Sequence, residues 1–201
     1  MPGRASTLAK LTSPRLYAVT RRERLLTLLR EHHRHHPLIW VAGPPGAGKT
    51  SLVANYLAEH KSRTLWYHVD PGDVDLATFF HYLAQAAQAA APRKKLRLPA
   101  LTPEFMADVP GFTRRFMREL WSKVPLPAVL VLDNYQELPI EALLHRMLPI
   151  ALAEFPQGAA LIVISREGVP EAFARELVHN GVGHIRWEDL RLTLEETASL
   201  A

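Results

Sequence analysis

The octapeptide at residues 43–50, Gly-Pro-Pro-Gly-Ala-Gly-Lys-Thr, constrains this chain more than any other segment, because it fits the phosphate-binding P-loop pattern G-x-x-x-x-G-K-[ST]. Glycines let such a loop turn tightly, so that successive backbone N–H groups point at phosphate oxygens. The helix that follows adds the positive end of its dipole. The pattern predicts a site for a nucleoside triphosphate with Mg²⁺, in which Lys49 reaches the β- and γ-phosphates and the Thr50 hydroxyl binds the metal.

The segments on both sides of the loop fit that prediction. Residues 38–42 form a short apolar run typical of a buried strand, and residues 51–58 carry apolar side chains at helical spacing. Strand, glycine-rich loop and helix is the order that the motif requires. The alternative is a Gly/Pro-rich turn that carries Lys-Thr by chance. The residues predicted to contact the nucleotide are Gly43, Pro44, Pro45, Gly46, Ala47, Gly48, Lys49, Thr50 and Ser51.

The composition is that of an ordinary globular domain. The chain has 201 residues, of which 48% are hydrophobic and 22% charged, enough for one α/β domain with a core. It has no cysteine, which excludes a disulfide framework, a thiolate nucleophile and a Cys-based zinc site. No apolar run approaches the roughly 20 residues of a membrane span, and the N-terminus lacks the apolar centre of a signal peptide, so we expect a cytoplasmic protein without a membrane partner.

Charged and histidine-rich clusters have simple interpretations. The net charge of +4 suits a nucleic-acid partner and equally a protein that binds a polyanionic nucleotide. The basic clusters at residues 21–24 and 93–97 are short and lack interleaved aromatic residues, so we interpret both as solvated surface. Four histidines in residues 32–36 invite a metal hypothesis, but Arg34 lies among them and Glu31 is the one nearby acid. The polar end of a helix is the simpler interpretation.

Strands that alternate with helices predict a three-layer α/β/α fold of the P-loop NTPase class, with a mostly parallel five-stranded sheet. Asp75 is expected to cap a helix, and Pro149 to interrupt one. Basic residues and three prolines make residues 91–103 a linker or surface excursion. The strands are expected at residues 38–42, 64–69, 128–133, 159–166 and 181–187, and the helices at 20–31, after the P-loop, at 76–87, at 104–122, from about 140, and at 170–180.

The chain is expected to have three parts: an N-terminal arm over residues 1–19, a P-loop NTPase domain over 20–187, and the start of a further domain over 188–201. Thr193 and Glu196 form the T-x-x-E pattern of a capping box that opens a helix. The sequence stops only two turns later, and an isolated helix of that length is marginal. We therefore expect a fragment cut just inside the further domain.

A second nucleotide motif follows downstream. Residues 128–133, Ala-Val-Leu-Val-Leu-Asp, form a continuous apolar run that ends in an acid, so Asp133 lies at the carboxyl end of a buried strand. Open α/β sheets bind their ligands at that edge. The pattern resembles the Walker B motif, whose carboxylate holds Mg²⁺, usually through a water. An isolated strand-end Asp is more simply a turn cap, but the P-loop favours Thr50 and Asp133 as metal ligands.

Hydrolysis also needs a group that orients or deprotonates water. Asn134 takes the place of a second acid, and an amide orients water but accepts no proton at neutral pH. Glu137 is the nearest alternative base, although a solvated or capping Glu is the simpler interpretation. Asp70, at another strand end, polarises the water or stabilises its own Asp-Pro-Gly turn, the simpler role.

Arg166 follows the predicted strand that ends at Ser165. A guanidinium there would contact the γ-phosphate and distinguish ATP from ADP, whereas the alternative is a surface Arg at a strand end. Arg166 therefore joins the predicted nucleotide-binding residues. The predicted catalytic residues are Lys49, Asp133, Glu137 and Arg166.

Together these residues resemble the STAND class, signal-transduction ATPases with numerous domains, and within it bacterial transcriptional activators of the MalT/LuxR type. The resemblance covers nearly the whole chain. Ile164-Ser165-Arg166 looks like their strand-Thr/Ser-Arg sensor, and residues 187–196 resemble the entry to their winged-helix or lid domain. Residues 10–15 and 19–26 are similar to the start of these proteins, and residues 66–70 with 79–83 are also similar.

The resemblance implies a parallel five-stranded sheet in which the P-loop strand is central and next to the sensor strand. It implies that the segment before the first helix packs on adenine, which places Val19, Arg21 and Arg22 on the adenine side. It further implies a switch in which ATP and an inducer shift a closed, ADP-bound monomer to an open, self-associating form, with DNA bound through a domain absent here. Asn134 departs from the family pattern, so we expect a slow ATPase used as a switch.

Two other functions are compatible with the motifs. A small-molecule kinase would need a substrate pocket and a mobile lid rich in arginines, and the basic residues 91–103 precede the Walker B strand. An AAA+-type remodelling ATPase would favour Asp-Glu over Asp133-Asn134 and an arginine finger supplied to a neighbour. Arg114, Arg115 and Arg118 are conceivable fingers, but nothing in the sequence selects them.

Overall fold

A five-stranded sheet forms the centre of the computed structural model, which describes residues 8–15, 21–60, 62–93, 95–179 and 181–198. All strand pairs are parallel, so every strand ends at the same edge of the sheet. The predicted fold class and the five strands are confirmed. The strands are β1 (Leu38–Ala42), β2 (Arg63–His68), β3 (Ala128–Asp133), β4 (Ala159–Ser165) and β5 (Val182–Ile185).

The place of the P-loop strand within the sheet differs from the prediction. The strand order is β2-β3-β4-β1-β5, so β4 is the middle strand and β1 lies between β4 and β5. The prediction that β1 lies next to the strand before Arg166 is confirmed, because Ala42 is in register with Ser165. The order results from long crossover connections between parallel strands, and such crossovers leave no signal in the local sequence.

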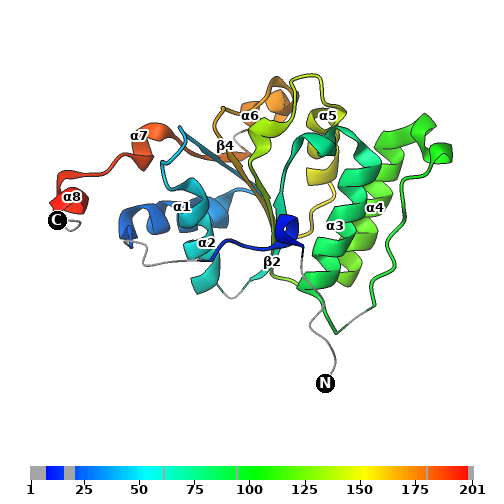
Figure 1. Cartoon of the computed structure of the whole chain (residues 1–201), viewed down its shortest axis with the longest axis horizontal. Helices are drawn as coiled ribbons and strands as arrows, with labels where there is room; N and C mark the ends of the chain where they lie inside the picture. The colour runs from blue at the N-terminus through cyan, green and yellow to red at the C-terminus, as the bar shows by residue number, and fades with distance from the viewer. Residues whose placement is uncertain (1–7, 16–20, 61, 94, 180, 199–201) are drawn as a thin grey trace.

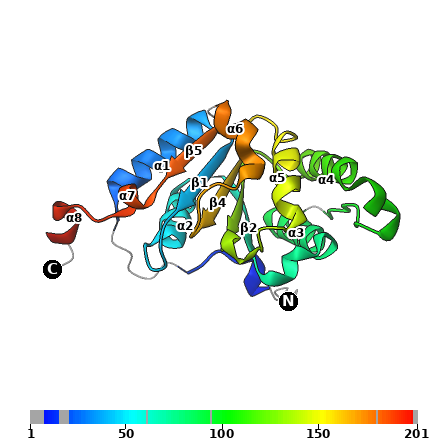
Figure 2. The same ribbon diagram turned by 90° about the horizontal axis from the view of Figure 1, so that it is seen from above.

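Helices cover both faces of the sheet. Figures 1 and 2 show α1 and α2 on one side and α3, α4 and α5 on the other, and each set packs on its own cluster of buried side chains. None of the helices in the described ranges has the length and the apolar character of a membrane span. The helices are α1 (Glu23–His35), α2 (Lys49–Glu59), α3 (Leu76–Ala90), α4 (Val109–Lys123), α5 (Leu143–Leu152), α6 (Ala174–Val178), α7 (Trp187–Leu190) and α8 (Leu194–Ala198). Short 3-10 helices are η1 (Ala9–Leu11), η2 (Pro71–Val74), η3 (Pro103–Asp108), η4 (Tyr135–Glu137) and η5 (Glu171–Phe173).

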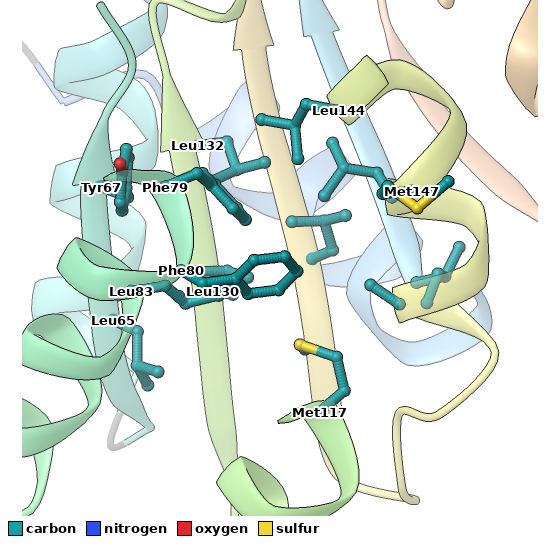
Figure 3. Close-up of a cluster of buried hydrophobic side chains, with 14 of the residues drawn as sticks. Leu65, Tyr67, Phe79, Phe80, Leu83, Met117, Leu130, Leu132, Leu144 and Met147 are labelled. Carbon is teal, nitrogen blue, oxygen red and sulfur yellow. The ribbon is translucent and has the colours of Figure 1, made fainter. Parts of the chain in front are cut away.

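The core beneath α3 follows from the spacing of its apolar residues. Phe79, Phe80 and Leu83 are buried and point toward Leu130 and Leu132 of β3 (Figure 3). Every residue of β3 and β4 is buried, because helices cover both faces of a parallel sheet. This is why both strands read as continuous apolar runs rather than as alternating patterns.

Several helices differ from their predicted limits. α1 continues through the histidine run and ends just before Pro37. α5 is not interrupted at Pro149, which removes one backbone hydrogen bond near the end of the helix while its apolar face stays buried. The segments predicted as single helices over 104–122 and 170–180 each begin as a 3-10 helix. The predicted cap is confirmed, because the Asp75 carboxylate accepts hydrogen bonds from two N–H groups in the first turn of α3.

The described part of the predicted arm, residues 8–15, packs beside β2. Lys10 Nζ donates to Asp70 Oδ2 at 2.6 Å and to Asp73 Oδ2 at 2.9 Å. Asp70 Oδ1 accepts the N–H of Gly72 at 2.9 Å. Asp70 therefore stabilises its own turn, as the simpler interpretation of this residue predicted.

One residue of the histidine run, His33, packs against α2, and we expect it to make the stability of the fold depend on pH. His33 Nδ1 lies 2.7 Å from the Tyr56 hydroxyl of α2, and its ring centroid is 5.1 Å from that of His60. Burial, and then the neighbouring His60, lower the pKa of His33 below its ordinary value of 6.5. The unfolded chain therefore binds more protons than the folded chain between the two pKa values. The contribution of His33 to stability is complete above about pH 6.5 and is lost as the pH falls below it.

We expect the urea midpoint of unfolding to decrease as the pH is lowered from about 7.5 to about 5.5. This decrease should be smaller in His33→Gln than in the wild-type chain. His35→Gln changes an exposed histidine in the same helix and is the matched control. The same pH dependence in His33→Gln and in the wild type would contradict this account.

Within the described ranges, no group of three His, Asp or Glu residues is arranged to hold a metal ion.

Candidate functional site

The P-loop connects the end of β1 to the start of α2. Gly48 has a φ of 79°, a conformation that glycine adopts without strain. Gly43 lies in close contact with the C-terminal segment, since a Cβ atom there would be 2.9 Å from Leu190 Cδ1. The Gly43 N–H donates to the Ser165 carbonyl at 3.3 Å, which fastens the loop to the end of β4. A Cβ atom at Gly46 or Gly48 would meet no described atom within 4 Å beyond its chain neighbours, so this part of the loop is open to a phosphate.

Lys49 is the first residue of α2, and it is 9% exposed. Its Nζ donates to the carbonyl oxygens of Gly43 at 2.6 Å and Pro44 at 2.9 Å. Burial, and then the positive charge of Arg166, lower the pKa of Lys49, whereas Asp133 opposes the shift. Arg166 is exposed, yet it lies close enough to act on the Lys49 ammonium. The Lys49 ammonium and the Arg166 guanidinium are neighbouring positive charges, and together they favour the binding of an anion such as a triphosphate.

The structure brings the two predicted metal ligands together. Thr50 Oγ1 donates to Asp133 Oδ1 at 3.0 Å, and Ser51 follows in the first turn of α2. Asp133 is 5% exposed, and its other oxygen, Oδ2, lies 3.8 Å from His68 Nδ1. Burial raises the pKa of the Asp133 carboxyl, while the hydrogen bond from Thr50 and the nearby His68 oppose that shift. A divalent cation would stabilise the buried carboxylate in its ionised form, so this pair fits Mg²⁺.

A chain of polar contacts crosses the ends of β2, β3 and β4. Asn134 has a φ of 64°, and its Nδ2 lies 3.1 Å from His68 Nε2. Gln136 Nε2 donates to Asn134 Oδ1 at 3.2 Å and to Glu137 Oε1 at 3.3 Å. Gln136 Oε1 accepts the N–H of Arg166 at 3.0 Å. The sequence interpretation missed His68 and Gln136, although a polar residue at or just beyond a strand end was an available signal.

The predicted base Glu137 is placed near this chain but outside the Thr50–Asp133 pair. Glu137 lies in η4, where its carboxylate accepts a hydrogen bond from Gln136. Among the described residues, no hydrogen bond joins Glu137 to Thr50 or Asp133. Asp133 Oδ1 instead accepts the N–H of Asn134 at 3.0 Å.

A pocket of about 420 Å³ opens beside the P-loop at the start of α1. Arg22 Nη2 donates to the Arg191 carbonyl at 2.9 Å and pairs with Glu196 at 3.1 Å, whereas its buried Nε has no hydrogen-bond partner among the described residues. Trp187 is 42% exposed. A partly exposed indole ring beside the P-loop fits a heteroaromatic group such as a nucleobase. The lining residues are Arg22, Gly46, Ala47, Gly48, Trp187, Leu190, Arg191 and Leu192.

Of the two described residues that were predicted for the adenine side, one lines this pocket. Arg22 does so, whereas Arg21 forms ion pairs with Glu23 and, at 3.3 Å, with Glu59. Val19 lies outside the described residues. The wall that contains Trp187 was missed, because it comes from the far end of the chain. A tryptophan two residues after the last strand was the available signal.

Two of the three candidate arginine fingers, Arg115 and Arg118, have partners within the chain. Arg118 Nε and Nη2 donate to the carboxylate of Glu154 at 2.6 and 3.0 Å. Arg115 Nε donates to Glu119 at 3.2 Å. These contacts give no reason to assign either guanidinium to a neighbouring molecule.

Comparisons with known proteins show which family this chain is similar to. A model of the protein family described as AAA domain matches residues 30–175. The chain is 30% identical to the HTH-type transcriptional regulator MalT of Vibrio cholerae over 202 residues, which cover 94% of this chain and 21% of that protein. It is 28% identical to MalT of Vibrio parahaemolyticus with the same coverage. The chain thus spans about a fifth of the length of these curated relatives.

A solved structure supports the fold alone. The Walker-type ATPase PABY2304 of Pyrococcus abyssi superposes with a TM-score of 0.56 at 14% identity, over 90% of this chain and 56% of that chain. The fold of this chain is therefore a known α/β architecture. The resemblance to MalT regulators predicted from the sequence is confirmed.

Proposed function

Because this chain belongs to the AAA domain family, we propose that it is the ATP-binding module of a longer, signal-responsive transcriptional regulator. The main observation in support is the 3.0 Å hydrogen bond from Thr50 Oγ1, at the end of the P-loop, to Asp133 Oδ1. Thr50 and Asp133 would hold Mg²⁺, and residues 43–51 would hold the phosphates of ATP or ADP. When bound, Mg²⁺ neutralises phosphate charge and orients the phosphates.

Each remaining residue of the site has a proposed role. Lys49 binds the β- and γ-phosphates, because its ammonium lies at the mouth of the loop within reach of two loop carbonyls. Arg166 contacts the γ-phosphate and so distinguishes ATP from ADP. Arg22 and Trp187 line the base site, and Trp187 binds the base by stacking.

We propose that hydrolysis is slow. The amide of Asn134 is occupied on both sides, by His68 and by Gln136, and an amide accepts no proton. Glu137 is the proposed base, and its contact with Gln136 leaves it outside the metal pair. A slow ATPase suits a switch whose nucleotide state persists long enough to be read.

Hydrogen bonds join the start of α1, beside the proposed base pocket, to the last described residues of the chain. Arg24 Nη2 donates to the Asp189 carbonyl at 2.8 Å, and Arg22 contacts Arg191 and Glu196. We propose that residues 188–201 begin a lid domain and that these contacts transmit the nucleotide state to it. In the cytoplasm, that state would control self-association of the longer protein, and a domain outside this chain would bind DNA.

The proposal predicts that Asp133→Asn abolishes the dependence of ATP binding on Mg²⁺. Without the carboxylate charge, we expect Mg²⁺-ATP to bind about tenfold to a hundredfold more weakly, while ATP in excess EDTA binds as it does to the wild type. Isothermal titration calorimetry with and without Mg²⁺ measures the effect. Asp108→Asn is the matched control, since asparagine caps α4 as well as aspartate does. An unchanged Mg²⁺ dependence in Asp133→Asn would refute the metal site.

A further inference from the structure

We propose that Gln136 is a positioning residue that holds Arg166 at the nucleotide site by tying it to the segment after Asp133. The inference rests on the proposed function, because the role of Arg166 concerns the γ-phosphate. Gln136 belongs neither to the P-loop nor to the Walker-type motif.

The two ends of the Gln136 amide make opposite kinds of hydrogen bond. Its oxygen accepts the backbone N–H of Arg166 at 3.0 Å, and its nitrogen donates to Asn134 Oδ1 at 3.2 Å. Asn134 in turn donates its own N–H to Asp133 Oδ1 at 3.0 Å. A half-buried amide thus bridges the ends of β3 and β4, and neither a carboxylate nor an apolar side chain can replace it at both ends.

The residues before and after Arg166 are held by hydrogen bonds to segments other than the one that contains Gln136. Trp40 Nε1 donates to the Glu167 carbonyl at 2.9 Å, and the Ser165 carbonyl accepts the N–H of Gly43 at 3.3 Å. These bonds tie Ser165 and Glu167 to β1 and to the P-loop. Among the described residues, the hydrogen bond that the Arg166 N–H donates to Gln136 Oε1 is the one that holds the backbone of Arg166 itself. Its loss would leave an exposed arginine held only through its neighbours.

The position of Arg166 matters because its charge already acts within the site. The Arg166 guanidinium contributes, after burial, to the lowered pKa of Lys49. A long side chain on a loop samples several rotamers, so its contact with a ligand depends on where its Cα atom is held. Gln136 supplies that constraint from the same segment that carries the metal ligand.

The test uses Gln136→Met, which keeps the length of the side chain and removes both ends of the amide. Calorimetry would give the dissociation constants of Mg²⁺-ATP and Mg²⁺-ADP for the wild type, Gln136→Met, Arg166→Gln and the double variant. We expect Gln136→Met to weaken ATP binding about threefold to tenfold and to leave ADP binding unchanged. In the Arg166→Gln background, the same change should have no further effect. Gln157→Met, an exposed glutamine before β4, is the matched control and should bind both nucleotides normally.

Each outcome decides between the alternatives. An equal loss of ATP and ADP binding, or a loss that persists in the Arg166→Gln background, would show a merely structural role and overturn the inference. An unchanged ratio of the two constants in Gln136→Met would also overturn it, while ATP binding by the wild type would leave the proposed function standing. Failure of the folded wild-type chain to bind either nucleotide would overturn both.

Discussion

Lys49→Ala is expected to weaken ATP binding by about a hundredfold or more while the chain stays folded. The ammonium is buried at the start of α2 and lies within 2.6 and 2.9 Å of the Gly43 and Pro44 carbonyls. Charge-assisted hydrogen bonds to phosphate in a site shielded from water are among the strongest that a protein makes. Alanine removes every donor of this side chain and keeps the helical conformation.

Fluorescence titration with a labelled ATP analogue measures the loss, and circular dichroism establishes that the variant is folded. Lys95→Ala makes the same change on an exposed lysine and should bind like the wild type. A Lys49→Ala variant that binds ATP within threefold of the wild type would show that the nucleotide does not occupy the P-loop.

Phe80→Ala is expected to lower the free energy of unfolding by about 3–5 kcal/mol. The Phe80 side chain is 2% exposed, and its ring centroid lies 4.8 Å from that of Phe116 and 5.0 Å from that of Phe112. It joins α3 and α4 to the sheet beside Leu130 (Figure 3). Truncation therefore loses apolar burial and leaves a cavity that three elements share.

Urea unfolding monitored by circular dichroism gives the change, and Phe105→Ala is the control. Phe105 also packs against Phe112, with ring centroids 5.4 Å apart, but it is only partly buried, so we expect a smaller loss. If Phe80→Ala cost no more than Phe105→Ala, the close packing between α3, α4 and the sheet would be wrong.

The sequence predicted those parts of the site that lie within one continuous segment. A P-loop uses consecutive backbone N–H groups and the start of the next helix, so residues 43–50 specify it locally. Asp133 was predicted for a similar reason, because a strand buried on both faces is a continuous apolar run and ends visibly at a polar residue. The strands predicted at residues 38–42 and 159–166 followed from the same kind of pattern, and the strand at 64–69 followed from its β-forming residues.

The sequence did not predict those parts that distant segments build together. Trp187 lines the same pocket as Arg22 because β5 pairs with the free side of β1. Gln136 meets Arg166, 30 positions away, because β3 and β4 are neighbours. Strand order depends on crossover connections, which also explains why β4 rather than β1 is central. Helix limits shifted where tertiary packing prevailed, as it did for the histidines of α1.

The most direct test of the central claim measures bound nucleotide and phosphate release together on the wild-type chain of 201 residues with Mg²⁺-ATP. The account predicts one nucleotide bound per chain and a turnover far below about one per second, the lower end of ordinary enzyme rates. A folded chain that binds no nucleotide at millimolar ATP would contradict the claim that this is an ATP-binding module. A turnover of many per second would contradict the claim that it is a switch.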